Sequence, residues 1–207
     1  MKNRLLTLLA GAVLLGAARF TAAPLNHTTH FHANWAVFTH GARIDLSDDR
    51  FMQEIGACTA SYAGILPEER VHLHENNPDV VHVHHDGVTW GHLFANLGMA
   101  LGDDFLHLAT GERFVAGAEG DADGAAGALV FILNGLPVPS VHNRLIRSGD
   151  RLLVSVTGEP PARVLETEYP QVADDAEAYN QAQDPSSCTG GHGELPLLTR
   201  LRLAFWG

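Results

Sequence analysis

The sequence predicts an α+β domain with a mixed, mainly antiparallel sheet and one packed helix, in a β-grasp-like arrangement. Segments with the two-residue hydrophobic alternation of strands lie on both sides of one segment with helical spacing. Hydrophobic residues make up 45% of the chain and charged residues 18%, which is enough apolar material for a buried core. We expect an apolar helix to precede this domain at the N-terminus.

Residues 1–23 have the pattern of a signal anchor or a signal peptide. Lys2 and Arg4 precede an uncharged run at residues 5–18. That run is short for a membrane span, but a span over residues 5–25 would be long enough. The first alternative is a single-pass inner-membrane protein with a periplasmic domain, because the basic end stays cytoplasmic. The second is a cleaved leader and a periplasmic protein, which Pro24 at the first mature position disfavours.

The domain is expected to span residues 24–158. Residues 30–38 alternate as a strand does, and residues 43–46 predict a second, short strand. Ser47 or Asp48 is expected to cap a helical turn at residues 51–55.

Two further strands are expected at residues 70–74 and 80–84, joined by a turn rich in Asn and Pro. Thr89 is then expected to cap a helix that continues to about Met99 and ends at Gly102.

The second half of the domain predicts a hairpin and a last strand. Asn134-Gly135 separates residues 129–133 from residues 136–138, and this dipeptide is a strong hairpin signal. After a turn at residues 148–150, residues 152–156 are expected to form the final strand.

Residues 159–207 are expected to form an extended acidic arm followed by an apolar C-terminal segment. Prolines and acidic residues recur over residues 159–194. In residues 195–207 hydrophobic residues alternate with other residues, which predicts either a closing strand of the sheet or a segment that docks on a partner. The expected docking residues are Leu201, Leu203, Phe205 and Trp206. Cys58 and Cys188 are expected to form one disulfide in an exported protein, the alternative being two independent thiols.

The charge of the chain argues against nucleic acid as a partner. The formal net charge is −11, and the only lysine is Lys2 in the leader. An acidic surface repels phosphate backbones, and it also disfavours docking on anionic lipid head groups.

Histidines are the most informative feature of the sequence. The chain has 13, and six of them form the His-x-His pairs His30/His32, His72/His74 and His82/His84. Residues i and i+2 of a strand share one face and lie roughly 6.6 Å apart, so two such imidazoles can converge on one ion.

The predicted hairpin between residues 70 and 84 would bring two of these His-x-His pairs together. We expect a register that opposes His74 to His82 and His72 to His84, which places all four rings on one face. A slip by one residue would destroy that arrangement. His85 is expected to point to the other side.

Neutral imidazoles suit Zn(II), Cu(II) or Ni(II), and the lack of nearby Met or Cys argues against Cu(I). We therefore expect one Zn or Cu ion, with Glu75, Asp79 and Asp86 orienting the rings. The alternative is a hydrogen-bonded histidine network or a partner contact without metal. The isolated histidines are expected to be structural or surface residues: His40, His107 and His142. Cys188 and His192 have loosely ligand-like spacing, but the disulfide is the simpler interpretation.

The sequence has none of the common catalytic signatures, such as a nucleophile elbow, a His-Glu-x-x-His helix or a phosphate-binding glycine loop. An enzyme would have to use the histidine site as a metal centre with an open position. Four histidine ligands would fill a tetrahedral site and exclude substrate.

Three stretches carry a resemblance: residues 30–38, residues 72–84 and residues 89–94. Together they are similar to a loosely defined group of exported bacterial and archaeal proteins that combine a His-x-His strand, a histidine hairpin and a following helix. That group has no established role, so the resemblance implies an exported His-rich domain and no particular chemistry.

The overall plan is also similar to accessory subunits of photosynthetic reaction-centre, light-harvesting and other electron-transfer complexes. Our leading hypothesis from the sequence is a non-catalytic, membrane-anchored accessory subunit facing the periplasm and contacting other subunits of a membrane complex. The alternatives are a free periplasmic copper- or zinc-binding protein and a small metalloenzyme with a histidine site.

Overall fold

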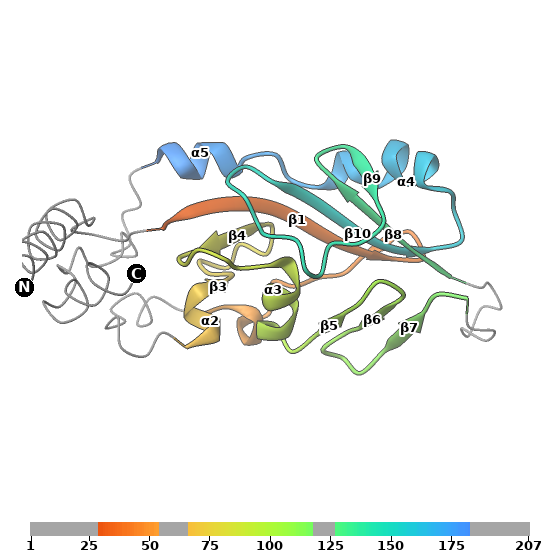
Figure 1. The fold of residues 1–207 in the computed structure, drawn as a ribbon, viewed down its shortest axis with the longest axis horizontal. Helices are drawn as coiled ribbons and strands as arrows, with labels where there is room; N and C mark the ends of the chain where they lie inside the picture. Colours follow the sequence, from red (N-terminus) through yellow and green to blue (C-terminus); the bar gives the residue numbers. More distant parts are fainter. Residues whose placement is uncertain (1–28, 54–65, 118–126, 183–207) are drawn as a thin grey trace, which may run out of the picture. The chain divides into compact units, whose positions relative to one another are not determined.

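The computed structural model describes residues 29–53, 66–117 and 127–182, which all belong to one compact unit. Its centre is a seven-stranded sheet in the order β3-β4-β1-β10-β8-β9, with β2 also paired to β1 (Figure 1). The strands are β1 (Phe31–Thr39), β2 (Ala42–Arg43), β3 (Val71–His72), β4 (Val80–Val83), β8 (Ala128–Leu133), β9 (Leu136–Val138) and β10 (Arg151–Thr157). Only the central pair β1 and β10 is parallel in this sheet. The prediction of an α+β fold with a mixed, mainly antiparallel sheet is confirmed.

A small antiparallel sheet and several short helices complete the described part. The small sheet contains β5 (Ala100–Leu101), β6 (Phe105–His107) and β7 (Arg113–Val115). The α-helices are α2 (Pro67–Arg70), α3 (Trp90–Asn96), α4 (Pro161–Thr167) and α5 (Ala176–Gln181), and the 3-10 helices are η1 (Asp49–Phe51) and η3 (Tyr169–Gln171). Among the residues that the structure describes, no helix has the length and hydrophobicity that a membrane span requires. The apolar helix predicted within residues 1–23 lies outside them.

One face of the large sheet packs on α3 and the small sheet to form the main core. Strand alternation puts Trp35 of β1 on this face, and its ring meets Phe94 of α3 edge-on at a centroid distance of 5.3 Å. Thr89 caps α3 as predicted, because its hydroxyl oxygen accepts a hydrogen bond from the His92 N–H. The predicted helix end at Gly102 is wrong. The helix stops at Asn96, and Gly98 turns the chain away with a φ of +71°.

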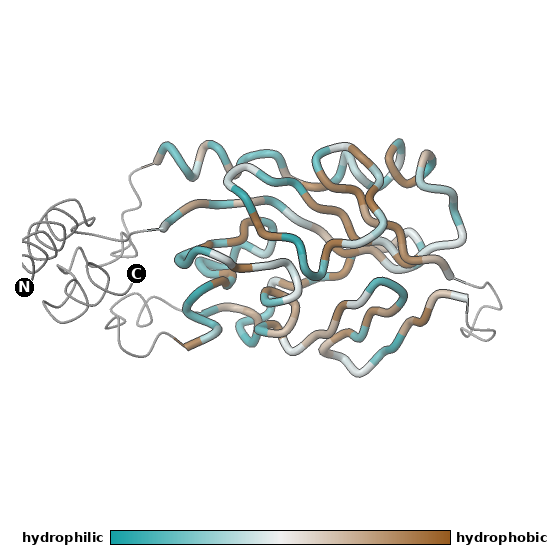
Figure 2. Tube along the Cα trace, viewed as in Figure 1, coloured by the Kyte–Doolittle hydropathy of each residue, from teal (hydrophilic) through white to brown (hydrophobic). Residues whose placement is uncertain are grey.

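The opposite face of the sheet is divided into two parts. Near α4 and η3 it is apolar, with Phe38, Ile132 and Leu153 packed against Val164 and Val172. Near α5 the same face carries histidines and Asn34 instead. Figure 2 shows the contrast, with hydrophobic residues along the central strands and mostly hydrophilic ones along α5.

The structure corrects the expectation of an extended arm after residue 158. Residues 161–181 form α4, η3 and α5, which lie along the sheet on the side away from α3 (Figure 1). Pro161 is at the first helical position, where a missing N–H costs nothing. Val164, Val172 and Ala176 are buried among otherwise acidic and polar neighbours, so a sparse apolar pattern is sufficient to dock this segment.

The predicted hairpin is confirmed as β8 and β9, with Asn134 and Gly135 both at positive φ. The last predicted strand is β10. The helical turn near residue 51 is the 3-10 helix η1, capped by Asp48. Cys58, Cys188 and the predicted docking residues 201–206 lie outside the described residues.

Candidate metal centre

Three adjacent strands bring six imidazoles together on one face of the sheet. In β1 and β4, His32 lies opposite His82, and in β3 and β4, His72 lies opposite the same His82. Each of the six rings lies within 6.5 Å of at least one other, centroid to centroid. We call this set the histidine face; it consists of His30, His32, His72, His74, His82 and His84.

The register predicted for the hairpin is wrong by two residues. His72 pairs with His82, and the His84 N–H donates to the Arg70 carbonyl at 2.8 Å. The cause is the turn, in which Glu75 and Asn76 both adopt positive φ and shift its centre towards the N-terminus. Because side chains alternate with a period of two, a two-residue shift leaves every histidine on the predicted face.

Three of these histidines form a group that can hold a metal ion. His30, His82 and His84 each offer one nitrogen, and these nitrogens all lie within 4.8 Å of one another. Nitrogens around a tetrahedral zinc lie about 3.4 Å apart, so small ring rotations would bring the three into coordination. His82 is buried, whereas His30 and His84 are partly exposed.

A hydrogen-bond chain from α5 sets the tautomer of His82. The Asn180 side-chain oxygen accepts from the His32 backbone N–H at 2.7 Å, which identifies that atom as the oxygen. The same oxygen lies 3.0 Å from His32 Nδ1, so this nitrogen carries a proton. His32 Nε2 is then an acceptor, and it lies 2.9 Å from His82 Nδ1, which must donate. A neutral His82 therefore keeps Nε2 unprotonated and available to a metal.

His72 is oriented in a similar way by the backbone. Its Nδ1 lies 2.9 Å from the Glu68 carbonyl oxygen, which can only accept, so Nδ1 carries the proton. In the neutral ring Nε2 is consequently a bare acceptor.

Burial keeps His72, His82 and His84 uncharged near neutral pH. Desolvation, followed by the charge of His74, lowers the pKa of His72 to about 4. The same causes in the same order hold the pKa of His82 far below its ordinary value. The pKa of His84 is also far below its ordinary value, first because of desolvation and then because of the charge of His72. Neutral imidazole is the form that binds a metal, so these three histidines can bind an ion without first losing the proton of a charged ring.

The outer shell differs from the one predicted. Asp79 forms an ion pair with Arg43, and Asp86 accepts from the Thr29 hydroxyl at 2.5 Å. Glu75 lies near a ring as predicted, with Oε1 3.9 Å from His74 Nδ1.

Sequence reasoning missed Asn180 and the Glu68 carbonyl, and it also missed Tyr179, whose ring lies 5.7 Å from that of His32. A backbone carbonyl leaves no sequence signal. The two α5 residues were hidden in a segment expected to be an extended arm.

Four further histidines that the structure describes, His40, His85, His107 and His142, lie apart from this face. His85 is exposed, with Nδ1 2.7 Å from the Asp86 carbonyl, and His40 is exposed at the turn after β1. His107 lies on β6, and His142 Nδ1 contacts the Asp103 carboxylate at 3.1 Å. Cys188 and His192 lie outside the described residues.

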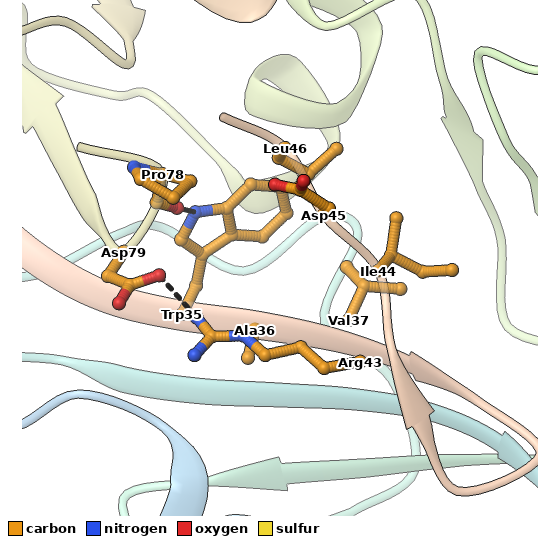
Figure 3. Close-up of a pocket in the computed structure, with 9 residues that line it drawn as sticks. All are labelled: Trp35, Ala36, Val37, Arg43, Ile44, Asp45, Leu46, Pro78 and Asp79. Atoms are coloured by element: carbon orange, nitrogen blue, oxygen red, sulfur yellow. Dashed lines mark hydrogen bonds and ion pairs between the residues drawn. The ribbon is translucent and has the colours of Figure 1, made fainter. Parts of the chain in front are cut away.

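Residues that line a pocket beside β1 and β2 help to position the turn between β3 and β4 (Figure 3). Trp35 lines it and donates from Nε1 to the Pro78 carbonyl at 2.9 Å. Arg43 and Asp79 form an ion pair in the same pocket. These contacts hold the start of β4 against β1; β4 contains His82 of the candidate triad, and His84 follows its last residue directly.

Comparison with known proteins gives no relative from which a role could be taken. The chain matches no family model, and no curated protein or solved structure is similar to it.

Proposed function

We propose that this chain is an exported metal-binding protein that holds a divalent transition metal ion, Zn(II) or Cu(II), on the histidine face. The observation that carries the proposal is the convergence of His30, His82 and His84, whose nitrogens lie within 4.8 Å of one another. All three ligands are imidazoles, the donors shared by zinc and copper(II) sites. The chain from Asn180 through His32 to His82 supports the proposal, because ligand histidines usually donate their second N–H to a fixed partner.

Metal analysis of the full chain, purified without a histidine tag, tests this proposal. We expect at least one Zn(II) or Cu(II) per chain after dialysis against excess metal and gel filtration. A double change, His82→Gln with His84→Gln, should reduce the affinity of the triad by a factor of at least 100, measured by isothermal titration.

The matched control is His107→Gln on β6, which changes the same residue type away from the histidine face. It should leave metal uptake unchanged. Binding of the same number of ions with unchanged affinity after the double change would overturn the proposal.

The three ligands also support a metalloenzyme as an alternative. Three protein ligands in a tetrahedral site leave one position for water, as in zinc hydrolases and hydratases. Under this alternative the zinc-loaded chain hydrolyses an activated ester or hydrates carbon dioxide faster than the His82→Gln, His84→Gln chain. Equal rates for both would refute it.

The membrane-anchored accessory subunit stays a separate proposal. It depends on residues 1–23 and on residues 195–207, which lie outside the described part of the chain. Mild solubilisation of native membranes followed by size separation tests it. Migration as part of a larger membrane complex would support this proposal, and a free species of about the mass of one chain would refute it.

We also propose that the sheet belongs to the β-grasp-like arrangements. The order β4-β1-β10-β8 supports this, because the first and last long strands lie parallel at the centre and each has an antiparallel outer neighbour. Helix α3 lies between the two halves in the sequence and packs on one face.

A further inference from the structure

We infer that the histidine face binds a second metal ion through His72 and His74, beside the ion proposed above. This inference rests on the proposed function, since it places the second ion next to the first. The triad accounts for three of the six histidines, and His32 is engaged in orienting His82. The face also contains His72 and His74, and both are almost completely buried, with 3% and 1% of their surface exposed.

His72 carries the argument. Its Nδ1 proton points to the Glu68 carbonyl, so its Nε2 is a bare acceptor. That Nε2 is buried and has no hydrogen-bond partner within the described ranges. A buried acceptor without a donor costs free energy, whereas an apolar ring could fill the same space without that cost. A metal ion would use the lone pair that the structure leaves pointing into the protein.

His72 is surrounded by other imidazole rings, as a metal-binding histidine would be. Its ring centroid lies 5.5 Å from that of His74 and 5.0 Å from that of His84, which belongs to the triad. The ring centroid of His74 lies 3.5 Å from that of His82, the buried member of the triad. A second ion at His72 and His74 would therefore lie next to the first, forming a binuclear centre.

Two adjacent dications repel each other, so such a centre needs negative charge. Glu75 follows His74 directly, and its Oε1 lies 3.9 Å from His74 Nδ1. Its side chain is partly exposed and can rotate towards the ion. Two imidazoles and one carboxylate leave the remaining coordination positions to water or hydroxide.

Copper(II) is the probe that tests this inference, because two copper(II) ions a few ångströms apart couple magnetically. We expect the full chain, purified without a tag, to bind two Cu(II) at equilibrium dialysis. The first ion should give the electron paramagnetic resonance spectrum of an isolated ion. Binding of the second should broaden that spectrum and reduce its integrated intensity.

In His72→Gln the chain should bind one Cu(II) and keep the isolated spectrum, and His74→Gln should do the same. The His107→Gln chain should bind two. Retention of the first ion also shows that each variant is folded.

Two outcomes would overturn the inference. One is a single ion on the unchanged chain; the other is a second ion that remains in both His72→Gln and His74→Gln. No ion at all on the unchanged chain would instead refute the proposed function, so the two failures are distinguishable.

Discussion

Mild acid should destabilise the metal-free protein, because protonation favours the unfolded chain. The pKa of His72 is lowered from 6.5 to about 4 in the folded state, mainly by burial. Between these two values the unfolded state binds a proton that the folded state does not. The stabilising contribution is therefore complete above pH 6.5 and is lost as the pH falls towards 4.

The magnitude follows from the size of the shift. Each pKa unit corresponds to about 1.4 kcal/mol, so His72 alone should remove about 2 kcal/mol between pH 6.5 and pH 5. His82 and His84 have pKa values lowered in the same direction and should add to the loss. A domain with a free energy of unfolding of about 5–15 kcal/mol would lose a large part of it.

Urea denaturation of the metal-free chain at pH 7.5, 6.5, 5.5 and 5 measures this loss. The unfolding free energy should be nearly constant down to pH 6.5 and then fall, and it should fall less steeply in His72→Leu. Zn(II) or Cu(II) should delay the fall, because a bound ion competes with protons for the same nitrogens. An unfolding free energy that does not change between pH 7.5 and 5 would contradict the buried, neutral state of these histidines.

Three further predictions concern single positions. Asn180→Ala should weaken metal affinity by a factor of about 10–100 without changing the number of ions, measured by titration, because His32 loses the partner that fixes its tautomer. Thr89→Ala should lower the unfolding free energy by about 1 kcal/mol in urea, because α3 loses its N-cap. Gly91→Ala should destabilise by about 1–3 kcal/mol despite the helix preference of alanine, because a Cβ there would lie 2.6 Å from the His142 carbonyl oxygen. Equal or higher stability of Gly91→Ala would show that the contact between α3 and residue 142 can relax.

Strand periodicity was enough to predict the histidine face but not its register. His-x-His spacing fixes which face of a strand two rings share, so the common face of His72, His74, His82 and His84 follows from the sequence. The register depends on the backbone angles of the turn. A positive φ is uncommon for glutamate, so the conformation of Glu75 could not be predicted from the local sequence.

The partners from α5 could not be predicted because tertiary contacts place them. Asn180 is 148 positions from His32 in the sequence, and α5 is a short helix in an acidic segment. Its position depends on Asn34, whose side-chain oxygen accepts from the N–H groups of Asp175 and Ala176. Such an anchor becomes visible only when the chain is folded.

The divided face of the sheet supports the proposal that the histidines bind a metal ion, because they contribute less to stability than apolar side chains would. Along β1 this face changes from His32 and Asn34 to Ala36 and Phe38 within a few residues, and both parts are buried. Burying an aliphatic side chain would contribute about 1.5–3 kcal/mol at each position, as it does in the apolar part under α4. A buried imidazole gains less, because its polar nitrogens must be desolvated. Six imidazoles on three neighbouring strands thus give up stability that the same sheet obtains elsewhere, and binding of a metal ion would restore it.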